Sequence, residues 1–277
     1  MASITDCVVE GLKYPFNDPK KLLGFGVLFA LISAMSTIAS FKSMDVFRFS
    51  MDAVEKTNST ITHMSVSQLP AGDVYLIIGL AIVSLIVAFF IMGYQYNIIK
   101  FSIDKRNDLP GFDDILGMFT KGIKYFLVTL AYNVIAILVL AAGTFFIKDY
   151  VVFLFVLLAF ILFIIANFLL VMALSNMIAY DSLKKAFDFR EIIDNIANLG
   201  WGKYIGIIIF TAIVYMIIMV AVSFILGFIT VLFAATINNQ AFVISIVIAI
   251  IEGLLIDSYA AVFYHRVCGS IYRESIK

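Results

Sequence analysis

Long, uninterrupted runs of apolar residues dominate the chain, and six of them are long enough to cross a membrane. A hydrocarbon core of about 30 Å requires about 20 helical residues. The six runs lie at 22–40, 74–99, 125–147, 150–178, 205–237 and 241–264. Within them, as at 151–165, apolar residues do not alternate with polar ones as they do in a membrane β-barrel. The pattern therefore predicts an all-α, polytopic integral membrane protein with six transmembrane helices.

A shorter amphipathic segment precedes each odd-numbered run. Apolar residues recur at helical spacing over 4–12, 112–123 and 183–199, with charged residues between them. Each segment leads into a Lys-Tyr pair, and a tryptophan precedes the third: Lys13 and Tyr14, Lys124 and Tyr125, Trp201 with Lys203 and Tyr204. We expect three helices lying in the cytoplasmic interface, with these residues as anchors, since Lys snorkels and Tyr and Trp favour the headgroup level.

This arrangement divides a single transmembrane domain, 1–277, into three pseudo-repeated hairpins. Each unit, at about 1–100, 101–179 and 180–277, joins an interfacial amphipathic helix to two transmembrane helices. All three run in the same direction, so a symmetry axis would follow the membrane normal. Parallel repeats occur in transporters, but duplication also builds other helix bundles.

The distribution of Lys and Arg predicts the orientation. Four of the nineteen, Lys42, Arg48, Lys56 and Lys148, fall on one side of the six spans, and the remainder fall on the side of both termini. The positive-inside rule then places both termini in the cytoplasm, in a plasma membrane. The segment 41–73 becomes the one large outer loop. It contains the candidate glycosylation site Asn58 in the triplet Asn58-Ser59-Thr60.

The fifth run is too long for a simple span. Its 33 residues, 205–237, would form a straight helix of about 50 Å. Two interpretations stay open: a break near Gly227, or one continuous, tilted helix.

Composition and charge narrow the class further. The chain is 63% hydrophobic and 14% charged, with formal net charge zero, which excludes a basic field for binding nucleic acid. Its only cysteines, Cys7 and Cys268, are too few for a disulfide scaffold or a cysteine metal site.

Two carboxylic acids interrupt the sixth run. Glu252 falls near the membrane midplane and Asp257 nearer the cytoplasmic side. Ser245, Ala249 and Gly253 form a ridge of small residues that favours close helix packing beside Glu252. We consider Asn133 and Asn167 as hydrogen-bond partners of an uncharged Glu252. The alternative is a proton or cation site in a transport path.

Signatures of catalysis are missing from the sequence. There is no nucleophile elbow, no His-Glu-x-x-His and no glycine-rich phosphate loop, and His63 and His265 fall on opposite sides of the predicted membrane. We therefore expect no enzymatic activity, no catalytic or metal-binding residues and no cofactor.

Several short motifs carry a resemblance to a known family. They are Leu12-Lys13-Tyr14-Pro15, Gly93-Tyr94, Leu109-Pro110-Gly111-Phe112-Asp113-Asp114, Gly122-Ile123-Lys124, Ala186-Phe187-Asp188-Phe189-Arg190-Glu191 and Gly200-Trp201-Gly202-Lys203-Tyr204. Together they resemble domain-of-unknown-function family four-zero-one-three, uncharacterised and mainly archaeal membrane proteins. The resemblance implies a six-helix integral membrane protein and supplies no site residues.

Three functions follow as hypotheses. The first is a non-enzymatic protein that organises, binds or moves lipid or another amphiphile at the inner leaflet, with membrane lipids as partners. The second is a small channel or transporter built around Glu252. The third is an interaction subunit of an envelope complex, or a homo-oligomer, with a partner at the outer loop.

Overall fold

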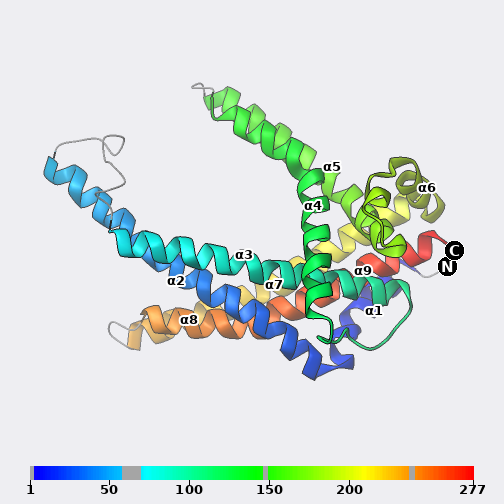
Figure 1. Ribbon diagram of the computed structural model, residues 1–277, viewed down its shortest axis with the longest axis horizontal. Helices are drawn as coiled ribbons and strands as arrows, with labels where there is room; N and C mark the ends of the chain where they lie inside the picture. Colours follow the sequence, from blue (N-terminus) through cyan, green and yellow to red (C-terminus); the bar gives the residue numbers. More distant parts are fainter. Residues whose placement is uncertain (1–2, 58–69, 146–148, 237–240) are drawn as a thin grey trace. The chain divides into compact units, whose positions relative to one another are not determined.

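The chain is helical wherever its structure is described. The computed structural model describes residues 3–57, 70–145, 149–236 and 241–277, and these ranges contain helices and turns without a strand (Figure 1). Six helices are long and apolar enough to span a membrane: Pro19–Met51, Ala71–Ile103, Ile115–Gly143, Val151–Tyr180, Trp201–Phe233 and Phe242–Ser275. The predicted all-α class is confirmed, and the chain is a multi-pass membrane protein.

The elements follow one another in a simple order. They are α1 (Ile4–Lys13), η1 (Tyr14–Asn17), α2 (Pro19–Thr57), α3 (Ala71–Ile103), α4 (Ile115–Gly143), α5 (Asp149–Tyr180), η4 (Leu183–Phe187), α6 (Phe189–Leu199), α7 (Trp201–Thr236), α8 (Ala241–Ile251), η5 (Glu252–Asp257) and α9 (Ser258–Ser275).

These elements contribute to two compact units. Unit 1 comprises Met1–Leu22, Met92–Ile217 and Ala260–Lys277, and unit 2 comprises Leu23–Ile91 and Ile218–Tyr259. Unit 1 therefore contains α1, α4, α5 and α6 complete, with parts of α3, α7 and α9. The boundaries between the units do not follow those of the three predicted hairpins.

Helix α2 is longer than its apolar run, so the predicted outer loop 41–73 is wrong over most of the part that is described. The helix has 39 residues and continues to Thr57, and α3 already begins at Ala71. The segment 41–57 contains neither Gly nor Pro, so its polar residues do not stop the helix. Ser43 and Ser50 donate hydrogen bonds to carbonyls four residues back. Asn58 lies outside the described residues.

The amphipathic segments differ from their predicted form. The first and third become the separate helices α1 and α6, but the second is the start of the continuous helix α4, which Asp114 caps. Stop signals explain the difference: Pro15 follows α1, and Gly200 ends α6 with a φ of 92°. Between Ile115 and Tyr125 there is no proline, and Gly117 and Gly122 both lie within the continuous helix α4.

The apolar faces of the two separate helices are covered by protein. Cys7, Val8 and Gly11 of α1 are buried, and so are Ile192 and Ile196 of α6. A Cβ placed on Gly11 would come within 3.0 Å of the Phe263 ring on α9. These faces therefore pack within unit 1, whereas the sequence pattern predicted that they would lie on the membrane.

The irregular point of the transmembrane region is in the sixth span and not in the fifth. Helix α7 continues through Gly227, so the break considered there is wrong and the continuous alternative is confirmed. A helix in hydrocarbon keeps its backbone hydrogen bonds because water does not replace them. A π-helical turn, η5, instead comprises Glu252–Asp257 and contains both membrane acids.

Unit 2 brings this π-helical turn into direct backbone contact with α2. A Cβ on Gly253 would lie 2.7 Å from the backbone nitrogen of Ala30, and one on Gly26 would lie 2.1 Å from the Leu254 carbonyl oxygen. The small-residue ridge predicted around Gly253 thus includes a true contact residue. Small residues allow membrane helices to approach this closely.

This contact predicts opposite effects of two identical substitutions. Gly253→Ala should lower stability by about 1–3 kcal/mol, because the opposing atoms belong to backbone and cannot move aside. In the matched control, Gly227→Ala, no described atom lies within 4 Å of the new Cβ, and alanine favours a helix by about 1 kcal/mol. Thermal midpoints of the purified variants in detergent measure the difference. Equal midpoints would contradict the contact.

Candidate functional site

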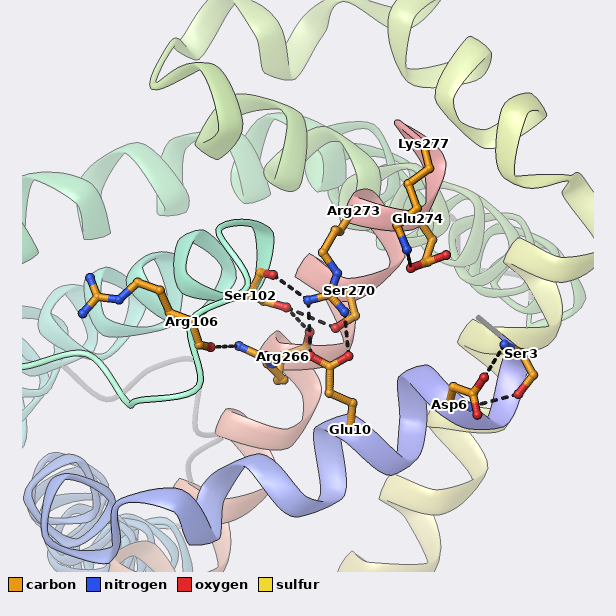
Figure 2. Close-up of polar contacts among 10 residues, drawn as sticks. All are labelled: Ser3, Asp6, Glu10, Ser102, Arg106, Arg266, Ser270, Arg273, Glu274 and Lys277. Atoms are coloured by element: carbon orange, nitrogen blue, oxygen red, sulfur yellow. Dashed lines mark hydrogen bonds and ion pairs between the residues drawn. The ribbon is translucent and has the colours of Figure 1, made fainter. Parts of the chain in front are cut away.

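A buried arginine joins the two ends of the chain in unit 1. Arg266 of α9 is 2% exposed, and its Nη2 and Nε lie 2.6 Å and 2.9 Å from Oε1 of Glu10 on α1 (Figure 2). Arg273, two turns later, places its Nη2 2.7 Å from the second carboxylate oxygen, Oε2. One carboxylate thus forms ion pairs with two guanidinium groups. A buried charge without such a partner is strongly destabilising.

The same arginines also donate hydrogen bonds to backbone carbonyls at the end of α3 and in the loop after it. Arg266 Nη1 donates to the Arg106 carbonyl at 2.6 Å, and Arg273 Nη1 donates to the Ser102 carbonyl at 3.0 Å. The Ser102 carbonyl lies in the last turn of α3 and also accepts from the backbone N–H of Lys105 at 3.2 Å, whereas Arg106 lies in the loop after this helix. Ser102 returns a bond from its Oγ to the Arg266 carbonyl at 2.7 Å. Helices α1, α3 and α9 are therefore joined by one network, which we call the arginine cluster.

The carboxylate of Glu10 is held in its charged form. Burial alone would raise the pKa of Glu10, but the hydrogen bonds and charges of Arg273 and Arg266 outweigh it and lower the pKa below its ordinary value of 4.5. Tyr14 lies with its ring 4.1 Å from the Arg266 guanidinium carbon. Burial raises the pKa of Tyr14 to about 12, so at neutral pH it remains a hydrogen-bond donor.

The loop between α3 and α4 is fixed by donors from outside it. Its carbonyls at Asn107, Asp108, Leu109 and Pro110 accept hydrogen bonds from Asn17, Tyr14, Lys21 and Tyr94 respectively. Tyr94 also stacks on Phe112, with ring centroids 4.9 Å apart. The Leu-Pro-Gly-Phe-Asp-Asp motif read from the sequence is thus a structural loop held in place by its neighbours.

The three Lys-Tyr tyrosines are internal donors in unit 1. Tyr14 and Tyr204 are 2% and 1% exposed, and Tyr204 donates to the Phe168 carbonyl. Tyr125 bonds to His265 at 3.0 Å. Burial excludes Tyr14 and Tyr204 from the headgroup-facing role expected of them, because their hydroxyls are satisfied by protein.

The other predicted anchors lie nearer the surface. Trp201 is 49% exposed and Lys13 is exposed, whereas Lys203 is half-buried. Lys124 is half-buried and forms an ion pair with Asp181 at 3.0 Å. Their depth in a membrane stays a prediction.

A cavity of about 220 Å³ lies in unit 1 between α3, α4, α5 and α9. Its lining combines polar and apolar residues: Gln95, Ile99, Tyr125, Thr129, Asn167, Leu170, Val171, Leu174, Tyr264, His265 and Cys268. Asp, Glu, Lys and Arg do not contribute to it. The cavity is thus a polar but uncharged space among membrane helices.

Thr129 gives this cavity an unused hydrogen-bonding group. Its Oγ1 is one of two buried side-chain polar atoms in the described part of the chain that have no partner; the other is Nδ2 of Asn195. Threonine in a membrane helix ordinarily bonds to the carbonyl four residues back. Thr211 follows that rule at 2.7 Å, and Thr230 at 2.8 Å. An unpaired buried hydroxyl costs about 1–3 kcal/mol, so Thr129 is a candidate contact for a ligand or water.

A polar bridge between α4 and α5 lies beside the cavity, whose lining includes Asn167. Asn167 Nδ2 donates to Asn133 Oδ1 at 3.0 Å and to the Phe163 carbonyl at 2.8 Å, and Asn133 Nδ2 donates to the Thr129 carbonyl at 2.9 Å. These bonds join α4 to α5 next to Thr129. The two asparagines proposed as partners for Glu252 thus bond to each other.

An apolar groove continues from this bridge along the same face of the α4–α5 pair. It encloses about 290 Å³ and is lined by Ala136, Ile137, Leu140, Val156, Ala159, Phe160 and Phe163. On α4, positions 129, 133, 136 and 140 form one helical stripe, and on α5, positions 167, 163, 160 and 156 form the antiparallel counterpart. A polar cavity, a hydrogen-bonded bridge and an apolar groove therefore follow one another.

A comparison with protein families decides the relationship of this chain. Residues 76–227 match a family described as "Protein of unknown function (DUF4013)", which is more than half of the 277 residues. The chain belongs to this family. The resemblance seen in the sequence motifs is thereby confirmed. No curated protein and no solved structure matches the chain.

The part matched to the DUF4013 family contains most of the candidate site. It includes Thr129, Asn133, Asn167 and the whole apolar groove, whereas Tyr264, His265 and Cys268 of the cavity wall lie after it. Both arginines of the arginine cluster and Glu10 also fall outside the matched residues. The family match thus covers the whole α4–α5 pair, together with α6 and most of α3 and α7.

The remaining predicted residues are placed as follows. Glu252 and Asp257 are both half-buried and share η5 of unit 2, whereas Asn133 and Asn167 belong to unit 1. Cys7 and Cys268 are free. His63 lies outside the described residues. Among those described, no group of three or more His, Cys, Asp or Glu side chains is arranged to hold a metal ion.

Sequence reasoning missed the principal cavity residues. Thr129 and Gln95 belong to no motif, and a single threonine in an apolar helix is unremarkable by composition. The available signal was the stripe that places Thr129 on the same face as Asn133, opposite Asn167 on the next helix.

The arginine cluster predicts an acid-sensitive stability. Because the pKa of Glu10 is lower in the folded state, its contribution is present above pH 4.5 and is lost as the pH falls below that value. At neutral pH, Glu10→Gln should lower the stability by about 3 kcal/mol, since Arg266 stays buried without a countercharge. Thermal midpoints measured across pH should also vary less in this variant.

The matched control changes a carboxylate at the surface. Asp104 lies 3.9 Å from Lys100 in an exposed pair, so Asp104→Asn should cost less than about 1 kcal/mol. If Glu10→Gln and Asp104→Asn give the same midpoint at neutral pH, the cluster does not stabilise unit 1.

Proposed function

We propose that this protein binds an amphiphile within the membrane and has no enzymatic activity. The polar end of the ligand would occupy the cavity beside Thr129, and its apolar chain would lie in the groove between α4 and α5. The observation that carries this proposal is the unpaired Thr129 hydroxyl at the head of a helical stripe that becomes wholly apolar.

The dimensions support a ligand from one leaflet. From position 129 to position 140 the stripe on α4 extends about 16 Å along the helix axis. That is about half of a hydrocarbon core of about 30 Å. A molecule with one polar head and one apolar end has the same order of features along its length.

The predicted orientation supports the cytoplasmic leaflet of the plasma membrane. Unit 1 contains both termini, which the distribution of Lys and Arg assigns to the cytoplasmic side. The polar cavity and the arginine cluster belong to this same unit. In the same predicted topology, Ala136 and Leu140 of the groove lie in the half of α4 nearer Lys148, so the apolar chain would extend from the cavity toward the outer side. The proposed role is to bind or organise such a molecule.

Removing one hydroxyl tests the proposal. Thr129→Val keeps the shape of the side chain and deletes the unpaired group, so the amount of amphiphile retained through purification should fall about tenfold. Lipid extraction and mass spectrometry of equal amounts of protein, purified in native nanodiscs, measure the retained molecules.

The control is the same substitution elsewhere in unit 1. Thr211 is buried, and its hydroxyl bonds to its own helix at Ile207, so Thr211→Val should leave the retained amphiphile unchanged. The proposal fails if wild type, Thr129→Val and Thr211→Val carry the same molecules in the same amounts.

The π-helical turn supports a second candidate function, a proton or cation site. Single π turns occur frequently at functional sites, and ionisable residues inside membrane helices are expensive to keep there. Here one such turn contains both Glu252 and Asp257. The backbone contact of Gly253 with α2 also fixes this turn against a neighbouring helix.

Flux measurements distinguish this candidate. In liposomes with an imposed proton gradient, Glu252→Gln should reduce proton flux at least about tenfold if the carboxyl carries the proton. Asp113→Asn, a change at an exposed loop carboxylate, should leave the flux at the wild-type rate. Wild type and Glu252→Gln giving equal flux would dismiss the transport role.

A further inference from the structure

The hydrogen bonds already made around the cavity restrict the chemistry of its ligand, provided that the proposed binding of an amphiphile holds. Each polar side chain in the lining has a fixed number of donors and acceptors. The donors and acceptors that make no bond within the protein are available to a ligand. Their kind and number restrict the headgroup more narrowly than the shape of the cavity does.

The cavity offers no charge to an ionic headgroup. None of its lining residues is Asp, Glu, Lys or Arg. His265 Nδ1 lies 2.7 Å from the Ala261 carbonyl, to which it donates, and Nε2 accepts from the Tyr125 hydroxyl at 3.0 Å. Both ring nitrogens are thus used by a neutral imidazole. Placing a phosphate or ammonium group here would bury a charge without a counter-ion, which is costly.

The asparagine bridge leaves one acceptor, Oδ1 of Asn167, and one amide hydrogen, on Nδ2 of Asn133. Asn133 donates to the Thr129 carbonyl, so its Oδ1 faces Asn167 and receives a hydrogen from Nδ2 of Asn167. The second hydrogen of that Nδ2 is donated to the Phe163 carbonyl. Within the described structure, Oδ1 of Asn167 then has no partner. A ligand that satisfies it must itself donate a hydrogen.

Thr129 and Gln95 also have hydrogen-bonding groups that the protein leaves unpaired. The Thr129 hydroxyl both donates and accepts, and it is unpaired. Gln95 is half-buried in the lining and makes no hydrogen bond to another described residue. An alcohol is an uncharged group that donates and accepts at once, so it matches these side chains.

We propose that the ligand is an uncharged amphiphile with a free hydroxyl headgroup, such as a diacylglycerol or a long-chain alcohol. The hydroxyl donates to Asn167 and accepts from Thr129, and the apolar chain occupies the groove lined by Ala136, Phe160 and Phe163. Esters and ketones, which only accept, leave Asn167 unsatisfied. Phospholipids bring a charge that the cavity does not balance.

Three lipids with the same two acyl chains test this headgroup rule on the full-length protein in nanodiscs. They are dioleoylglycerol, its acetate ester, in which the hydroxyl is capped, and dioleoylphosphatidic acid. Native mass spectrometry at equal lipid concentrations should show dioleoylglycerol bound at least about tenfold more tightly than either of the others. Thr129→Val should remove this preference, whereas Thr129→Ser, which keeps the hydroxyl, and Thr211→Val should preserve it.

The outcomes separate this inference from the function on which it rests. Equal binding of the alcohol and the ester, with both weakened by Thr129→Val, would overturn the headgroup rule and leave amphiphile binding in place. Preferential binding of phosphatidic acid would overturn it in the same way. If none of the three lipids binds and no amphiphile is retained during purification, the proposed function itself fails.

Discussion

Every polar group that enters the membrane region has to find its partner within the protein, because hydrocarbon supplies none. Charged groups buried in the protein have the same need, as the arginine cluster shows in unit 1. Arg266 and Arg273 are neutralised together by Glu10, and they also donate to the carbonyls of Arg106 and Ser102. The loop before α4 is held by four more donors, including Tyr14 and Tyr94. The position of these elements is therefore set by hydrogen bonds as much as by apolar packing.

Because buried polar groups need partners, the unpaired hydroxyl of Thr129 is informative. Where nearly every buried group is paired, an unpaired hydroxyl at Thr129 stands out against Thr211, whose hydroxyl bonds to its own helix. The exception also lies where a cavity, the Asn133–Asn167 bridge and an apolar groove meet on one face of a helix pair. A site defined by what the protein leaves unsatisfied needs no catalytic signature.

The sequence predicted the six spans because the length of an apolar run and the thickness of a bilayer are linked directly. It did not predict where helices end outside the hydrocarbon, since α2 continues through polar residues that contain no stop signal. Gly227 looked like a break, yet the π-helical turn formed around Gly253, where a neighbouring backbone approaches. Burial of Tyr14 and Tyr204 was equally hidden, because an aromatic residue beside a lysine is also typical of a membrane interface. Tertiary contacts decided each of these points.

The link between Glu10 and Arg266 also sets the order in which the protein can mature. The two residues are 256 positions apart, so their contact forms only after the last helix has been synthesised. Until then, Glu10 of α1 lacks both of its guanidinium partners. Such long-range closure is slow compared with local helix formation. Assembly of unit 1 is thus a late event in biogenesis, and a ribosome that stops before α9 releases a chain without Tyr264, His265 and Cys268 of the cavity wall.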